Sequence, residues 1–222
     1  SFQKYIQMGL KISSANSLEY LKFLRFKTSY LNKSGQDEAA IQLSDSILSI
    51  PAAMQNFVLS QRVRIEKCKA LIRIGKSKEA IAIMFDMLEK TEAINDTAIA
   101  LMAFTVLGWA NMELGKNEEA IKWLEKGKNC TPVQTYFIQN PALYVNLGSC
   151  YNNISNYQKA LEVINEGLNQ ARKGENLTFT ANALNIRADI YINMKKNDQA
   201  QRDLEESLGI REQIGDEYYM LS

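Results

Sequence analysis

The sequence predicts an all-α fold of stacked helical hairpins, and three observations support this prediction. The phrase IGKSKEAI at residues 74–81 returns forty residues later as LGKNEEAI at 114–121. Among 222 residues, glycine (11) and proline (3) are too scarce for the many tight turns of a β-sandwich or barrel. The hydrophobic share of 46% is enough for a substantial core. Repetition at this interval is typical of helical solenoids.

One alanine marks the same position in five successive forty-residue units. Other positions at spacings of three and four residues share its helix face, so they are expected in the core. The position twelve residues before the alanine always holds a small residue, which predicts a close helix crossing there. The alanines are Ala40, Ala80, Ala120, Ala160 and Ala200. The core position four residues after each alanine is occupied by Ser44, Met84, Leu124, Ile164 and Leu204.

Each unit is therefore expected to contain a first helix, a tight turn and a second helix that carries the alanine. Residues 2–12 are expected to form a preceding second helix, and residues 217–222 the start of a further first helix. First helices should end near Gly35, Gly75, Gly115, Ser155 and Lys195, where glycine suits a left-handed cap. Asp96, Asn176 and the pair Asn140–Pro141 are start signals, and Gly174 and Gly215 are expected to end second helices.

The stretches LGWANMELGKNEEAIKWLEKG (107–127) and LGSCYNNISNYQKALEVINEG (147–167) resemble the tetratricopeptide repeat (TPR) family. The resemblance implies a right-handed α-solenoid of about five hairpins, with partial repeats at both ends and residues 1–222 forming a single array. The period is forty residues instead of 34. Such elongated repeats resemble those of bacterial signalling and regulatory proteins, including sensor kinases, transcriptional regulators and peptide-pheromone receptors. The family is a scaffold, so the resemblance alone assigns no activity.

Residue types that carry chemistry are missing or badly spaced. The chain contains no histidine, which excludes His-based acid–base catalysis, nucleophile pairs and metal ligands. Cys68, Cys130 and Cys150 lack metal-site spacing and are expected to be reduced and buried. No P-loop or nucleophile-elbow motif occurs. We therefore expect no enzymatic activity, no cofactor and no metal.

Charge and hydropathy exclude two further classes of partner. The formal net charge is +1, with no long run of one sign, which argues against nucleic-acid binding. The apolar, uncharged stretch Thr97 to Met112 is shorter than the roughly 20 residues of a membrane span. No targeting segment is evident, so a cytoplasmic or a periplasmic location stays open, as does homo-oligomerisation.

The family resemblance implies a concave groove lined by first helices. The partner-binding residues expected there are Arg25, Arg62, Lys69, Arg73, Trp109, Asn152, Asn153, Asn182, Asn185 and Asn193. Ile65 and Thr105 are outward-facing in the same register. The alternative is that these are ordinary solvated side chains. For Trp109 the alternative is core packing.

The expected groove changes in character along the chain. Residues 1–74 carry 11 Lys+Arg and 5 Asp+Glu, a net charge of +6, whereas residues 75–222 carry 15 and 20, a net charge of −5. Basic residues thus precede apolar ones, and asparagines follow, whose amides both donate and accept hydrogen bonds. This order favours a protein or peptide partner of acidic character.

Two functions fit this pattern. The first is a protein- or peptide-binding scaffold module within a signalling or regulatory protein. The second is the peptide-sensing domain of a sensor kinase or transcriptional regulator whose effector domain lies elsewhere. Both imply that the chain is a fragment of a longer protein. Neither identifies the partner.

Overall fold

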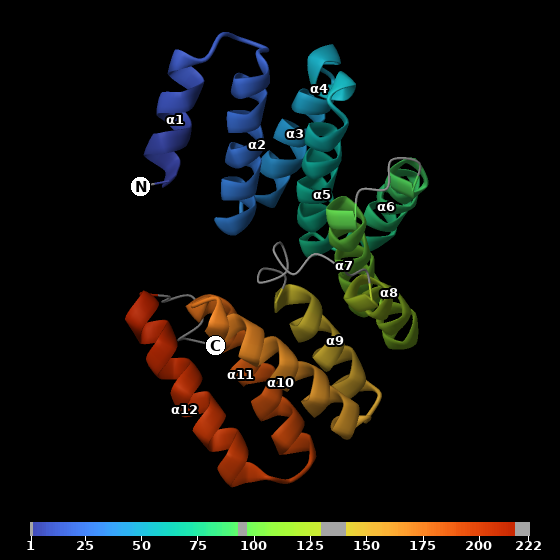
Figure 1. Ribbon diagram of the computed structural model, residues 1–222, viewed down its shortest axis with the longest axis vertical. Helices are drawn as coiled ribbons and strands as arrows, with labels where there is room; N and C mark the ends of the chain where they lie inside the picture. Colours follow the sequence, from blue (N-terminus) through green and yellow to red (C-terminus); the bar gives the residue numbers. More distant parts are fainter. Residues whose placement is uncertain (1, 93–96, 130–140, 216–222) are drawn as a thin grey trace. The chain divides into compact units, whose positions relative to one another are not determined.

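The computed structural model describes residues 2–92, 97–129 and 141–215, and all regular structure in these ranges is α-helical (Figure 1). The predicted all-α solenoid of helical hairpins is confirmed. The chain forms two compact units, residues 1–114 and 115–222. That the whole chain is a single array stays a prediction. The helices are α1 (Phe2–Ile12), α2 (Leu18–Lys33), α3 (Asp37–Leu48), α4 (Pro51–Gln55), α5 (Phe57–Arg73), α6 (Ser77–Glu92), α7 (Thr97–Glu113), α8 (Asn117–Asn129), α9 (Pro141–Asn153), α10 (Tyr157–Lys173), α11 (Leu177–Asn193) and α12 (Asn197–Ile214).

Unit 1 is built from the hairpins α2–α3 and α5–α6, with α1 packed along α2 and α7 packed against α5 and α6. The first helices α2 and α5 are neighbours, and so are α5 and α7. Short α4 lies in the connection after α3 and was not predicted. It begins at Pro51, whose fixed φ suits the first turn of a helix. The N-terminal part of the core is the cluster Leu21, Ile47, Ala53, Leu59 and Val63.

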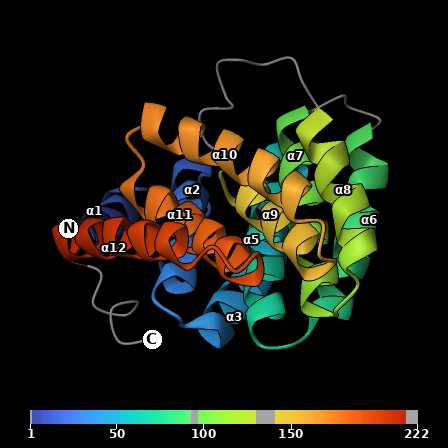
Figure 2. The same cartoon turned by 90° about the horizontal axis from the view of Figure 1, so that it is seen from below.

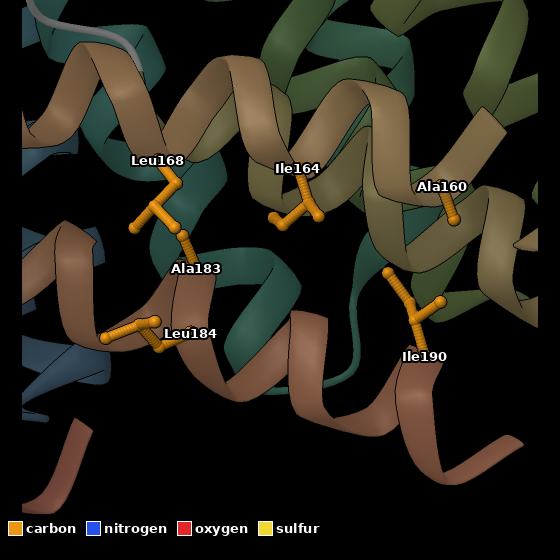
Figure 3. Close-up of a cluster of buried hydrophobic side chains, with 6 residues drawn as sticks. All are labelled: Ala160, Ile164, Leu168, Ala183, Leu184 and Ile190. Atoms are coloured by element: carbon orange, nitrogen blue, oxygen red, sulfur yellow. The ribbon is translucent and has the colours of Figure 1, made fainter. Parts of the chain in front are cut away.

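Unit 2 stacks its helices in chain order. α9 packs against α8 and α10, and α11 packs against α10 and α12 (Figure 1 and Figure 2). The contact between α10 and α11 contains a cluster of buried side chains, in which Ile164 and Leu168 face Ala183 and Leu184 (Figure 3). The first helix α11 and the second helix before it, α10, thus share an apolar contact.

The predicted hairpin turns are confirmed in position and conformation. Each has three residues, and its middle residue is left-handed, with φ of 68° at Gly35, 79° at Gly75, 72° at Gly115, 60° at Ser155 and 60° at Lys195. The following backbone N–H closes the turn, as Gln36 N–H does on Leu31 O at 2.9 Å. This closure satisfies carbonyls at the helix end. Because Ser155 and Lys195 carry a Cβ, they adopt this conformation at a cost.

The start and stop signals of the helices are confirmed where the structure describes them. The Asn176 side chain accepts the Phe179 N–H, and Gly215 caps α12 with φ of 67°. Helix α9 begins at Pro141 as expected. Gly174 is the C-cap of α10, but the left-handed residue is Glu175, with φ of 52°. Asp96, Asn140 and Cys130 lie outside the described residues.

The repeat register is confirmed, with one exception. All five marker alanines are buried, as are Ser44, Met84, Leu124 and Ile164 four residues later. Leu204 was expected in the core, and this prediction is wrong, because 43% of its surface is exposed. Its equivalent Ile164 lies in the core cluster that α10 and α11 share. Helix α12 has no later helix beside it among the described residues, so Leu204 lacks that cover.

Candidate binding site

The first helices α2, α5 and α7 of unit 1 bring together a set of polar and aromatic side chains. We call this set the first-helix face and define it by six residues. Two come from α2, three from α5 and one from α7. They are Arg25, Asn32, Glu66, Lys69, Arg73 and Trp109.

At the centre of this face, Asn32 joins α2 to α5. Its Nδ2 donates to the backbone oxygen of Glu66 at 2.9 Å and to Glu66 Oε2 at 2.7 Å. Lys69 Nζ lies 3.0 Å from the other carboxylate oxygen, Oε1. Burial raises the pKa of Glu66, but Lys69, the Asn32 bond and Arg25 outweigh it, so the pKa lies below its usual value. Glu66 is therefore held as a buried, fully bonded carboxylate.

Arg73, the last residue of α5, links this centre to the first residue of α3 and to α7. Its Nε donates to Asp37 Oδ1 at 2.7 Å, and Nη2 donates to Asn32 Oδ1 at 2.7 Å. Its guanidinium lies 6.0 Å from the centroid of the Trp109 ring, at the outer limit of a cation–π contact. A side chain fixed by three neighbours loses little further entropy when it binds a ligand.

Trp109 lies half-buried on α7. Its indole N–H donates to Glu113 Oε1, 2.8 Å away on the next turn. The ring is thus oriented by its polar edge, while part of its surface stays open. Half-burial beside Arg73 places it among the polar side chains of the face, whereas Gly108 beside it is buried.

A second basic group lies at the other end of the face. Burial, and then the nearby charge of Arg62, lower the pKa of Arg25, and Glu66 only partly offsets this. The Nε of half-buried Arg62 is buried and has no hydrogen-bond partner among the described residues. Both Glu66 oxygens are bonded to Asn32 and Lys69, and Arg62 keeps one unused donor, its Nε. Such donors match carboxylate groups.

In unit 2 the predicted asparagines hydrogen-bond mainly within the protein. Asn193 Nδ2 donates to Asn152 Oδ1 at 3.0 Å, which joins α11 to α9. Asn153 Nδ2 donates to Asn117 Oδ1 at 3.0 Å. Asn182 accepts from Arg211 on α12 at 2.9 Å, and Asn185 is half-buried. The bonds of Asn152, Asn153, Asn182 and Asn193 are therefore separate contacts within this unit.

Two outward-facing predictions are wrong. Ile65 is 1% exposed and Thr105 is 8% exposed, so both face the core. In place of Ile65, the neighbouring Glu66, about 100° further around α5, joins the first-helix face. Sequence reasoning missed Glu66, Asn32 and Asp37. The available signal was spacing, because Glu66 lies four residues after Arg62 and Asn32 seven after Arg25.

The described residues contain no group of three or more His, Cys, Asp or Glu side chains arranged to hold a metal ion. Within the same residues, none of the helices combines the length and the apolar character that a membrane span requires. Cys68 and Cys150 are free and buried, as predicted.

Comparison with known proteins gives consistent results. Two tetratricopeptide repeat models match residues 103–129 and 139–218. No curated protein sequence matches the chain. A Rap protein solved in complex with competence and sporulation factor is 15% identical, with a TM-score of 0.72 over 96% of this chain and 64% of its own. This chain thus spans less than two thirds of that protein's length.

Two further solved structures have the same fold. A thermophilic TPR protein from Thermus thermophilus is 16% identical, with a TM-score of 0.67, covering 85% of this chain and 90% of its own. YrrB, described as a TPR protein with an unusual peptide-binding site, is 15% identical, with a TM-score of 0.50, covering 95% and 92%. Identities this low show the fold alone. The repeated hairpins, their register and the family models that match residues 103–129 and 139–218 together support assignment to the tetratricopeptide repeat family.

Proposed function

We propose that this chain is a scaffold that binds a protein segment or peptide on the first-helix face of unit 1. The observation that carries the proposal is the bonded network Asp37–Arg73–Asn32–Glu66–Lys69 beside half-buried Trp109. Recognition sites require side chains that neighbouring residues hold in place, and aromatic and arginine anchors dominate binding energy. The Rap complex and the YrrB description support this proposal by analogy of fold.

The partner proposed for this face is acidic. The Nε of Arg62 has no acceptor among the described residues, and residues 1–74 carry a net charge of +6. Charge complementarity of this kind mainly accelerates association and selects among partners. The proposed role requires no catalysis, because the repeat fold serves as a scaffold.

A direct test is binding of fluorescein-labelled random peptide pools that differ only in net charge, followed by fluorescence polarisation. We expect the acidic pool to bind best, and Trp109→Ala to weaken binding by about 2 kcal/mol while the protein stays folded. Arg62→Glu should slow association and reduce its salt dependence. The matched control is Lys122→Glu, at an exposed position of α8. It removes an ion pair with Glu119 and lies outside the first-helix face.

Equal binding of all pools, with no loss in Trp109→Ala or Arg62→Glu, would refute the proposal. A Trp109→Ala variant that unfolds at a much lower denaturant concentration would show instead that this ring is part of the core. The two measurements, binding and unfolding, therefore distinguish a role of Trp109 in recognition from a role in core packing.

The second candidate function is a peptide sensor within a longer regulatory chain. The similarity to a Rap protein complexed with its factor, over 96% of this chain, favours it. A sensor must change conformation on binding, so small-angle scattering with and without a selected peptide should give different radii of gyration. Identical scattering curves would contradict the sensor function, and only the scaffold function would then remain.

A further inference from the structure

Unit 1 contains a cavity that shares no residue with the first-helix face. It lies between α1, α2 and α3 and has a volume of about 610 Å³. This volume is within the usual range of ligand-binding pockets. Helix α1 packs against α2, and α3 packs against α2 (Figure 1). All three helices contribute residues to the lining of the cavity.

The floor of the cavity is apolar. Ile6 is 2% exposed, and Leu10, Leu31 and Leu43 are half-buried. Ile6 and Leu10 lie four residues apart on one face of α1, which gives the floor its length along the helix. Such a floor provides a place for one large apolar side chain.

The rim consists mainly of amide groups. The lining includes Gln3 and Gln7 of α1, Gln36 at the N-cap of α3, and Gln42 of α3. All four are exposed. Gln3 Oε1 accepts a long bond of 3.3 Å from the Tyr30 hydroxyl, whereas the structure gives Gln7, Gln36 and Gln42 no side-chain partner among the described residues. These amides can both donate and accept hydrogen bonds.

The spacing of these amides matches an extended polypeptide. Residues four apart on a helix are separated by about 6 Å along its axis. In an extended chain, every second residue turns its N–H and C=O to the same side, at intervals of about 6.6 Å. Gln3 and Gln7 along one wall can therefore bond successive same-side residues of a strand lying in the cavity.

Charge further restricts the occupant. Among the described residues that line the cavity, Lys27 is the only charged one, and none is a carboxylate. A lysine or arginine on a bound segment would have no partner there. A neutral or acidic segment is compatible.

We propose that this cavity binds an extended segment of a partner polypeptide, with one large apolar side chain on the Ile6–Leu10–Leu31–Leu43 floor and its backbone bonded by the glutamine rim. The segment carries no basic residue beside that side chain. This inference is independent of the proposed use of the first-helix face.

The test is selection of a phage-displayed random octapeptide library on the parent chain, with affinities then measured by fluorescence polarisation. The rim variant is Gln7→Ala with Gln42→Ala, both at exposed positions. The matched control is Gln158→Ala with Gln213→Ala, two exposed glutamines of unit 2. Circular dichroism and a denaturant melt confirm that each variant is folded.

We expect a class of selected peptides with one large apolar residue and no neighbouring Lys or Arg. These peptides should bind the rim variant about tenfold more weakly, the loss expected for two hydrogen bonds. They should bind the control and Trp109→Ala like the parent. With Lys27→Glu, the selected peptides should admit Lys or Arg beside the large apolar residue.

If every selected peptide binds the rim variant as tightly as the parent, the inference is overturned. Peptides weakened by Trp109→Ala but not by the rim variant would overturn it while supporting the proposed function of the first-helix face. A parent chain that selects no peptide would overturn both.

Discussion

Replacing Gly167 by alanine tests the close packing of α9 against α10. A Cβ at residue 167 would lie 2.4 Å from the Cβ of Tyr144 and 3.1 Å from its Cγ. Neither atom belongs to a flexible side-chain end, so rotation cannot relieve the contact. The Tyr144 hydroxyl is also held, 3.1 Å from Glu166 Oε1 and 2.9 Å from the donating Gln170 Nε2. One of the two helices must move.

The expected effect has two opposing parts. Overpacking a tight core contact costs about 1–3 kcal/mol. Alanine in a helix interior is favoured over glycine by about 1 kcal/mol. Because the clash involves a Cβ, the cost should lie at the upper end, which leaves unit 2 about 1–2 kcal/mol less stable. Gly209 on α12 offers the matched control, since its added Cβ meets nothing within 4 Å.

Urea unfolding followed by circular dichroism measures both variants. We expect Gly167→Ala to lower the transition midpoint and Gly209→Ala to raise it, the latter by about 1 kcal/mol in free energy. Both glycines lie in unit 2, so the same transition is compared. A Gly167→Ala protein stabilised as much as Gly209→Ala would refute the close approach of α9 and α10.

Four further predictions concern the stability of the fold. Ala120→Leu should cost about 1–3 kcal/mol in urea unfolding, because Ala120 is fully buried; an unchanged midpoint would contradict the register. Ser155→Gly and Lys195→Gly should each stabilise the protein by about 1 kcal/mol, because both residues have left-handed φ; a loss would show that their side chains matter more. Burial first, with Glu166 adding to it, raises the pKa of Tyr144 to about 12, so folding stability should fall as pH rises above about 10, and less in Tyr144→Phe. The lowered pKa of Glu66 predicts stability that is present above about pH 4.3 and lost as pH falls further, and Glu66→Gln should flatten this dependence in acid unfolding curves.

The candidate site was only partly predictable from the sequence. Helical periodicity placed Arg62, Lys69, Arg73 and Trp109 on one face because outward positions recur every three or four residues. It could not show that Arg73 is bonded to Asp37 and Asn32, since these partners lie 36 and 41 residues away in the chain. Charge reversal at Arg73 would therefore disturb folding as well as binding.

The fold itself was determined by the sequence, because a hairpin repeated every forty residues buries its apolar face only against its neighbours. Small residues at the helix crossings and glycine at the turns are required by local geometry, so both can be recognised in the sequence. Only the tertiary structure decided which polar groups satisfy one another: the asparagines of unit 2 pair across helices, and Ile65 turns into the core while Glu66 joins the first-helix face. Those choices depend on contacts between distant segments and on burial by neighbouring helices, which no local pattern contains.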